Sequence, residues 1–473
     1  MSESLQRTAK IFRGCRITAQ KYEQGSEFSF DIYVPPQAGE NDELALYLLL
    51  EQRIDILAPL LDTLMQEGLI PFGMIVFCSS GWLYPSMPYG DKRRMRAEEL
   101  DQFGVDFSNF LIEELIPEAC RIAKTTLSSS PDMHFISGAS SGGLAAWNAV
   151  WFRNDYFRRA FLSSPTFSAM RGGEEAMVLV RKTESKPIKL YLTVGTEEPD
   201  YFFGSSLIAA TNAASALEFA GYDFRFEQFN GEGHGCRRED PTLWRRMMGF
   251  IWANWKSIPV TTLGKQIRIQ HLVADDAAWE VYEGAFPDKP VLSVCGGVYS
   301  FKGGEIFFEK NGTKQIVASG FGRISALGLS SDLWRLYIAD ESRRFIFAMS
   351  IQPDGSLTNL YKHAPMHLAY DFRKAGASDI AVLSDDRVLA ATELGIQGII
   401  SFGIVDLILP LPGDLPAERV AVVGNTLYVA SGDKLFTRRL KVSAPAGDGV
   451  PVPPSTTQYG DGFSYNRSHL FFA

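Results

Sequence analysis

The sequence predicts two domains of different fold class, a three-layer α/β domain followed by an all-β domain. A chain of 473 residues is too long for one ordinary hydrophobic core. Up to about residue 255, short apolar runs alternate with helical stretches, which is typical of a parallel sheet covered by helices on both faces. After that point, short strands recur between turns rich in glycine, aspartate and asparagine. We therefore expect an α/β domain over residues 1–256, a linker over 257–266 and an all-β domain over 267–473.

The α/β domain is expected to follow the order β, β, α, β, α, β, α, β, β, α, β, α. The predicted strands are short apolar runs over residues 28–34, 45–50, 72–78, 133–136, 159–162, 189–194 and 223–229. The predicted helices cover residues 54–66, 107–123, 143–157, 204–220 and 242–255. Apolar residues such as Phe110, Leu111, Leu115 and Ala119 recur at helical spacing, so one side of that helix is expected to face a core.

The all-β domain contains a loosely repeated pattern. Runs that resemble Leu-Tyr-x-Ala, each between two turns, recur near Leu336, Leu389 and Leu427. Their spacing is near the roughly 40–45 residues of one four-stranded propeller blade. The roughly 200 residues of this domain would make about four or five blades, so we expect a β-propeller.

Composition and charge exclude several function classes. No run approaches the roughly 18 apolar residues of a membrane helix, and no secretory signal precedes the first strand, so a soluble cytoplasmic protein is expected. The net charge is −9, and the basic run Lys92-Arg93-Arg94 is followed at once by acidic residues, which argues against nucleic acid or anionic membrane as a partner. Five scattered cysteines without a C-x-x-C pair predict reduced, mostly buried thiols.

The sharpest local signal is Gly138-Ala139-Ser140-Ser141-Gly142-Gly143, which lies between a predicted strand and a predicted helix. This is the setting of a nucleophile elbow, where small residues let a serine adopt a strained backbone and stand clear of the sheet. The pattern predicts Ser140 as the nucleophile of an α/β-hydrolase fold. An ordinary tight turn between strand and helix is the alternative.

A serine needs a base, and histidine is the side chain suited to take and return its proton. His134 lies inside a predicted strand and is expected to be structural. His234 lies in a glycine-rich turn after the last strand, where it can reach over the carboxyl edge of the sheet. We expect His234 to be the base, and an exposed loop histidine is the alternative.

The third member of a triad should be a carboxylate after the preceding strand, where Glu197, Glu198 and Asp200 compete. Glu198 is the first choice, and any of the three could be a solvated loop charge. The oxyanion hole would use the backbone N–H of Ser141 and a second N–H near Glu51 or Gln52, with Gln52 preferred.

Several blocks resemble the esterase family that includes enterochelin esterase, esterase D and feruloyl esterases, over nearly all of residues 25–256. Four blocks are similar to the family's R-S-x-E-Y-D, FL-x-EEL-x-P, G-x-S-S-G-G and L-R-G-G runs, namely RAEELD at 96–101, FLIEELIP at 110–117, the elbow at 138–143 and FSAMRGG at 167–173. Residues 195–198 stand where the family has G-x-x-D, and residues 220–223 and 231–235 match its A-G-Y-D and histidine turn.

The resemblance implies an α/β-hydrolase fold with Ser140, His234 and Glu198 in the triad. It also implies that Arg96, Glu99 and Arg171 line or brace the pocket, and each could instead be a structural ion-pair partner, which is the favoured interpretation for Glu99. The family usually has Asp-Gly where this chain has Glu51-Gln52, and aspartate where it has Glu198. Trp82 could stack on a substrate ring, although loop aromatics more often serve local packing.

The second domain resembles the gluconolactonase and senescence-marker-protein family of β-propellers, chiefly through residues 326–340, 343–357 and 387–392. That family's chemistry depends on a divalent metal held on the propeller axis by oxygen ligands. Here the corresponding positions fall on Gly296-Gly297-Val298, Ser325-Ala326 and Ser378-Asp379. We therefore expect a propeller without metal or catalysis, which shapes, covers or recognises the substrate.

These observations predict a serine esterase that works through an acyl-enzyme on a small-molecule ester and needs no cofactor. The ester could be sugar-linked, phenolic or siderophore-like. The alternatives are a metal-dependent lactonase in the propeller and a binding protein with a decayed elbow. The sequence leaves open whether the chain forms a homo-oligomer.

Overall fold

The structure is a computed structural model, and it describes residues 9–36, 43–83, 93–260, 266–275, 277–370 and 372–445. The chain divides into two compact units. The first comprises Met1–Arg181, Ser185–Lys265 and Ala369–Asp371, and the second comprises Lys182–Glu184, Gln266–Leu368 and Phe372–Ala473. Residues 261–265 of the expected linker lie outside the described residues.

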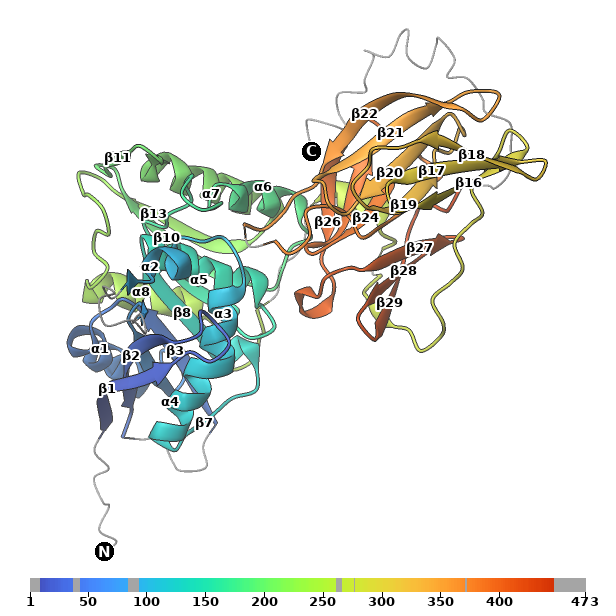
Figure 1. The fold of residues 1–473 in the computed structure, drawn as a ribbon. Helices are drawn as coiled ribbons and strands as arrows, with labels where there is room; N and C mark the ends of the chain where they lie inside the picture. The colour runs from blue at the N-terminus through green and yellow to red at the C-terminus, as the bar shows by residue number, and fades with distance from the viewer. Residues whose placement is uncertain are drawn as a thin grey trace, which may run out of the picture. The chain divides into compact units, whose positions relative to one another are not determined.

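The first unit is built on a mixed sheet of 11 described strands (Figure 1). Its main path has the order β13-β10-β9-β8-β3-β4-β2-β5-β6, while β1 pairs with β2 and β7 with β3. The strands are β1 (Lys10–Thr18), β2 (Ser26–Val34), β3 (Glu43–Leu50), β4 (Gly73–Cys78), β5 (Trp82–Leu83), β6 (Arg93–Arg94), β7 (Thr126–Leu127), β8 (His134–Ala139), β9 (Arg159–Ser163), β10 (Lys189–Gly195) and β13 (Asp223–Phe229). From β13 to β4 all neighbours are parallel, whereas β2 runs antiparallel to β4 and to β1.

Helices cover the sheet and extend its core. They are α1 (Ile54–Gln66), α2 (Arg96–Leu100), α3 (Asp106–Phe110), α4 (Ile116–Ala123), α5 (Ser141–Phe152), α6 (Glu175–Lys182), α7 (Ser206–Ala220) and α8 (Pro241–Ile251). Helices α1 and α8 pack on one face of the sheet, where Trp244 of α8 meets Phe161 of β9 with ring centroids 5.6 Å apart. Every residue of α5 is buried. The turn at Ser140 therefore leads directly into a helix that is packed inside the first unit.

Local sequence explains where the later helices begin and end. Asp240 accepts a hydrogen bond from the Thr242 N–H at 2.8 Å, and Pro241 follows as the first residue of α8. Helix α7 ends at Gly221, whose φ of 76° is a left-handed conformation that glycine adopts readily. Asp240 thus fixes where α8 begins, and Gly221 fixes where α7 ends before β13.

The predicted strands and helices of this unit are confirmed as elements, with shifts at their ends. The helix expected over 107–123 is instead α3, a π-helical turn at Leu111–Leu115 and α4. The sequence analysis missed β1 and α6. Strand β1 alternates exposed and half-exposed residues, so it lacks the apolar pattern on which the prediction relied.

The second unit contains four antiparallel sheets of four strands each within its described residues. The strands are β15 (Ser293–Val294), β16 (Gly297–Lys302), β17 (Glu305–Lys310) and β18 (Thr313–Ala318); β19 (Ile324–Leu329), β20 (Arg335–Asp340), β21 (Phe345–Ile351) and β22 (Leu357–Pro365); β23 (Asp379–Val382), β24 (Val388–Thr392), β25 (Gly395–Ile400) and β26 (Ile404–Leu409); and β27 (Arg419–Val423), β28 (Thr426–Ser431), β29 (Lys434–Arg439) and β14 (Glu280–Val281). A short helix, α9 (Ile267–Leu272), precedes them.

The repeated sequence pattern has one structural position. Leu336, Leu389 and Leu427 lie in β20, β24 and β28, each of which pairs with an edge strand of its four-stranded sheet. All three side chains are buried, so the repeat marks the apolar centre of successive sheets. In the last sheet β14, the first strand of the unit, pairs with β29, the last described strand.

The structure bears on two expectations from the composition, the state of the cysteines and the lack of a membrane helix. All five cysteines are free, but only Cys78 is buried, so the expectation of mostly buried thiols is wrong for the other four. No helix in the described part of the chain is long and apolar enough to cross a membrane.

Candidate active site

Four neighbouring strands of the first unit end side by side at the carboxyl edge of the sheet. Ala139 of β8 lies opposite Ser163 of β9, which lies opposite Thr193 of β10. Gly195 of β10 lies opposite Phe229 of β13. Loops that follow the carboxyl ends of parallel strands meet at this edge, which is where open α/β sheets bind ligands. The loops after these strands carry Ser140, Ser164, Glu198 and His234 respectively.

Ser140 occupies a strained turn between β8 and α5. Its φ is 56° and its ψ is −124°, a combination that costs a residue with a side chain on the order of 1–3 kcal/mol. Its N–H donates to the Ser163 carbonyl at 2.9 Å. A Cβ at position 138 would lie 2.0 Å from the Gly142 carbonyl oxygen, so only glycine fits there. The structure thus gives Ser140 the backbone of a nucleophile elbow.

His234 is paired with a buried carboxylate. Its Nδ1 lies 2.5 Å from Oε2 of Glu198, whose side chain has no exposed surface. Glu198 Oε1 accepts hydrogen bonds from Ser164 Oγ at 2.5 Å and from the Gly195 N–H at 3.3 Å. Burial acts to raise the pKa of Glu198, but the hydrogen bonds from His234 and Ser164 outweigh it and hold this pKa below its ordinary value. Glu198 is therefore a charged partner for the imidazole.

The other two candidate acids lie elsewhere. Glu197 and Asp200 are both exposed, and Asp200 belongs to the two-stranded hairpin of β11 (Asp200–Tyr201) and β12 (Gly204–Ser205). Of the three acids weighed from the sequence, the structure brings Glu198 to His234. His134 lies within β8, where its ring nitrogens are both 2.9 Å from backbone carbonyl oxygens, as expected of a structural histidine.

Ser164 is a part of the site that the sequence analysis missed. Its φ is 44°, and its N–H donates to the Thr193 carbonyl at 2.7 Å. Its Oγ donates to Glu198 and accepts from the Gly235 N–H at 3.1 Å, so one hydroxyl ties the acid to the histidine loop. A pair of serines before a proline at the end of a buried strand was the available signal.

The loop Ser163–Thr166 joins the two halves of the site. Ser163 accepts the Ser140 N–H, Ser164 holds Glu198, and Thr166 Oγ1 lies 3.5 Å from Ser140 Oγ. Among the described residues, no hydrogen bond joins Ser140 Oγ to His234. Such bonds are often long in enzymes without substrate and shorten when the substrate is bound.

The two expected oxyanion donors lie beside the elbow. Ser141 begins α5, where helix N–H groups lack partners within the helix. Leu50, at the end of β3, lies close to Gly142: a Cβ added to Gly142 would be 3.7 Å from the Leu50 Cβ. The Gln52 side chain donates from Nε2 to Ser137 Oγ at 2.8 Å. For the second donor, the sequence offered the N–H of Glu51 or that of Gln52. The Glu51 N–H already donates to the Cys78 carbonyl at 2.8 Å, so only the Gln52 N–H remains a candidate.

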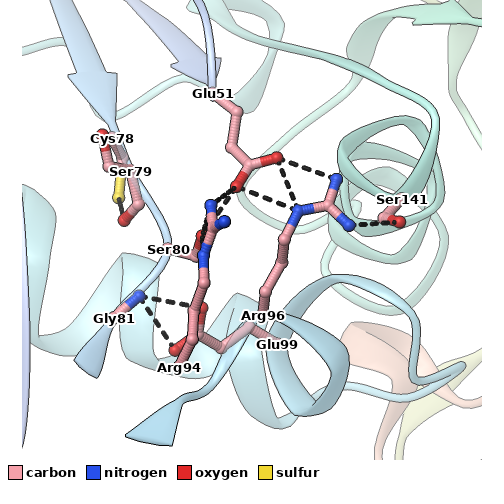
Figure 2. Close-up of polar contacts among 9 residues, drawn as sticks. All are labelled: Glu51, Cys78, Ser79, Ser80, Gly81, Arg94, Arg96, Glu99 and Ser141. Atoms are coloured by element: carbon pink, nitrogen blue, oxygen red, sulfur yellow. Dashed lines mark hydrogen bonds and ion pairs between the residues drawn. The ribbon is translucent and has the colours of Figure 1, made fainter. Parts of the chain in front are cut away.

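A polar network flanks the elbow (Figure 2). Arg96 Nε donates to both oxygens of the Glu51 carboxylate, to Oε1 at 3.1 Å and to Oε2 at 2.9 Å, and Arg96 Nη2 lies 2.9 Å from Oε2. Arg96 Nη1 donates to Ser141 Oγ at 2.9 Å. Arg94 Nη2 and Ser80 Oγ also bind Glu51, at 3.0 and 2.6 Å. Burial acts to raise the pKa of Glu51, but these hydrogen bonds and charges hold it below its ordinary value.

The remaining expected pocket residues differ in exposure. Glu99 is buried and accepts the Gly81 N–H on both carboxylate oxygens at 3.0 and 3.1 Å (Figure 2). Within the described part of the chain it forms no ion pair, unlike the ion-pair partner favoured from the sequence. Arg171 is partly exposed and contacts Glu98 at 3.3 Å. Trp82 is partly buried in β5, with the Arg94 guanidinium 6.0 Å from its ring centroid.

In the second unit, the residues at the positions that correspond to the metal ligands of the gluconolactonase family do not suit a divalent metal. These positions carry glycine, valine, serine and alanine, apart from Asp379. Lys289 Nζ donates to Asp379 Oδ1, and the Val420 N–H donates to Oδ2 at 3.0 Å. An ammonium group thus neutralises the one carboxylate at these positions. Among the described residues there is no group of three or more His, Cys, Asp or Glu that could hold a metal ion.

No protein-family model matches the sequence, and no curated protein matches it. Similar solved structures include a ferulic acid esterase, 15% identical with a TM-score of 0.40, covering 52% of this chain and 98% of that chain. The BES protein of Bacillus cereus is 17% identical with a TM-score of 0.37, and the match covers 53% of this chain and 97% of that chain. The enterochelin esterase of Shigella flexneri is 19% identical with a TM-score of 0.39, and the match covers 52% of this chain and 58% of that chain.

The buried Glu99 predicts a pH dependence of stability. Burial raises its pKa from 4.5 to about 8, so the folded state keeps a proton that the unfolded state has lost, and stability falls as the pH rises through this window. Relative to Glu99→Gln, the wild type should lose roughly 2–3 kcal/mol of unfolding free energy between pH 6 and 8.5. The unfolding free energy of both proteins is measured at each pH by urea unfolding, followed by tryptophan fluorescence.

Glu67→Gln is the matched control for this measurement. The Arg245 hydrogen bond lowers the pKa of Glu67, so this exposed carboxylate does not titrate between pH 6 and 8.5. The control should keep a constant difference from the wild type over that range. An equally constant difference for Glu99→Gln would contradict the prediction.

Proposed function

We propose that the first unit is a serine esterase that hydrolyses carboxylic esters through an acyl-enzyme. The observation that carries this proposal is the His234–Glu198 pair, held by Ser164 at the sheet edge where Ser140 occupies a strained elbow. A serine, a histidine and a buried carboxylate from three loops are the parts that nucleophilic acyl transfer needs.

In the proposed reaction, Ser140 Oγ attacks the ester carbonyl while His234 Nε2 takes its proton. The Nδ1–H of His234 donates to Glu198, which fixes the tautomer and stabilises the imidazolium without itself becoming protonated. The N–H groups of Ser141 and Gln52 hold the tetrahedral oxyanion. His234 then protonates the leaving alcohol, and water releases the acid by the reverse sequence. This route uses only side chains and backbone groups of the chain.

The fold of the first unit supports the same proposal. The elbow follows a central strand, β8, and enters a fully buried helix, as in α/β-hydrolases. Along the chain the acid and the histidine come after the serine, which is the order Ser, Glu, His of that fold. We infer that the unit is an α/β-hydrolase domain.

Two aromatic residues near the histidine support a proposal for the substrate class. Tyr201 meets the His234 ring edge-on with centroids 6.3 Å apart, and it stacks on Phe203 at 4.7 Å. An apolar wall beside the base suits an ester with a planar or apolar group, within the sugar-linked, phenolic and siderophore-like esters expected from the sequence. Arg171 and Trp82 remain candidates for contact with the substrate.

For the second unit we propose a β-propeller that takes no part in the chemistry. Four successive four-stranded sheets, with the first strand of the unit in the last sheet, support the architecture. The Lys289–Asp379 contact supports the lack of metal chemistry, because the ammonium group occupies a carboxylate that a metal would need.

Replacement of the nucleophile tests the proposal. Ser140→Ala and His234→Gln should each lower kcat for p-nitrophenyl acetate by at least about 10³-fold, because the three residues of a catalytic triad act together and each variant removes one of them. Stopped assays of released p-nitrophenol, with circular dichroism to check folding, measure this. Activity that survives in Ser140→Ala and disappears with a chelator would instead indicate the metal-dependent alternative.

The neighbouring glutamates provide an internal comparison for the acid. Glu198→Gln should reduce kcat by roughly 10²–10⁴-fold, since the amide cannot stabilise the imidazolium as a carboxylate does. Glu197→Gln, one residue away and exposed, should change kcat by less than about twofold. The assignment of the acid is wrong if the two variants behave alike.

A further inference from the structure

We propose that Glu51 is a positioning residue, which acts through Arg96 to hold Ser141 where its backbone N–H can bind the oxyanion. This inference rests on the proposed esterase function. It assigns a role to the side chain at a position considered from the sequence only for its backbone N–H. Glu51 directly follows β3, whereas Arg96 and Ser141 are the first residues of α2 and α5.

The backbone of Glu51 shows that its placement is maintained against a cost. Its N–H continues the pairing of β3 with β4 by donating to the Cys78 carbonyl, and the chain then turns with φ of 51°. A left-handed conformation is unfavourable for a residue other than glycine, because its Cβ comes too close to the following carbonyl oxygen. Such strain persists where the surroundings hold the residue, and it clusters at functional sites.

The carboxylate of Glu51 is the centre of the network in Figure 2. It accepts from Ser80 Oγ, Arg94 and Arg96, and the bond to Arg96 engages both of its oxygens. Bidentate pairs of this kind fix the plane of a guanidinium as well as its position. Because Nε and Nη2 of Arg96 are used for Glu51, Nη1 is left aimed at Ser141 Oγ, 2.9 Å away.

Ser141 is the point at which this network reaches the chemistry. It follows the nucleophile directly, and it is buried, with 4% of its surface exposed. An oxyanion donor works only within about 2.7–3.1 Å of the oxygen that it stabilises. A hydrogen bond from Arg96 to the Ser141 hydroxyl limits the rotation of this residue. The network therefore holds the donor in place before the substrate binds.

The experiment compares Glu51→Gln with Glu51→Asp in the full chain, using p-nitrophenyl acetate. Without the carboxylate, Arg96 loses its charged partner, so Glu51→Gln should lower kcat by roughly 10–100-fold and change KM by less than about threefold. Glu51→Asp keeps the charge and tolerates the left-handed backbone, so it should recover part of the loss. Inhibition by a trifluoromethyl ketone, which forms the oxyanion, should weaken by the factor lost in kcat/KM.

A double-mutant cycle tests whether Arg96 acts through Ser141. Arg96→Met and Ser141→Ala should each lower kcat, and the double variant should lose little more than the worse single variant, because both changes remove the Arg96–Ser141 hydrogen bond. Ser141→Ala also removes the hydrogen bond of Ser141 with Asp101. Asp55→Asn is the matched control: its carboxylate pairs with Arg13 at the surface, so kcat should stay within about twofold. Circular dichroism and thermal unfolding of all variants separate loss of fold from loss of position.

The outcomes separate this inference from the proposed function. If the wild type hydrolyses esters and Ser140→Ala does not, but folded Glu51→Gln keeps the wild-type kcat, the positioning role is wrong and the esterase proposal stands. A large rise in KM with unchanged kcat would also overturn the inference, since it would mean that the arginines bind the substrate directly. If the wild type is inactive or Ser140→Ala remains active, the esterase proposal fails first.

Discussion

The arrangement of the site depends on the burial of the Glu198 carboxylate against His234. A buried charge is tolerated only when hydrogen bonds and an opposite charge replace its lost hydration. Here Ser164 and the Gly195 N–H bind one oxygen and the imidazole faces the other, so each contact constrains a different loop. The loops after β9, β10 and β13 are thereby held together, and the chemistry assigned to His234 follows from this constraint.

Three residues with a strained backbone lie at the same edge of the sheet. Glu51, Ser140 and Ser164 follow the neighbouring strands β3, β8 and β9, and all three have positive φ although none is glycine. Each costs of order 1–3 kcal/mol, which the surrounding fold must offset. Each also places a side chain at the candidate site: the nucleophile, the hydroxyl that holds the acid, and the carboxylate that holds Arg96. The strain is thus linked to the geometry that the reaction needs.

The sequence predicted the elements and the residues that local patterns mark, but not the contacts that depend on how loops meet. The helix over residues 54–66 was predicted to the residue, because apolar spacing defines it, and Ser140 and His234 were found through their glycine-rich turns. The roles of Ser164 and of the Glu51 side chain were not predicted. Their partners lie 29 to 71 residues away, and only the strand register brings them together.

Covalent labelling of the wild type by a fluorophosphonate, located by mass spectrometry of the digested protein, shows whether Ser140 is an activated nucleophile. An activated serine reacts with this reagent, whereas an ordinary surface serine does not. The account predicts one adduct, on Ser140, that forms much more slowly in the His234→Gln variant. A folded wild type that carries no adduct on Ser140, or that labels equally fast without the imidazole, would contradict it.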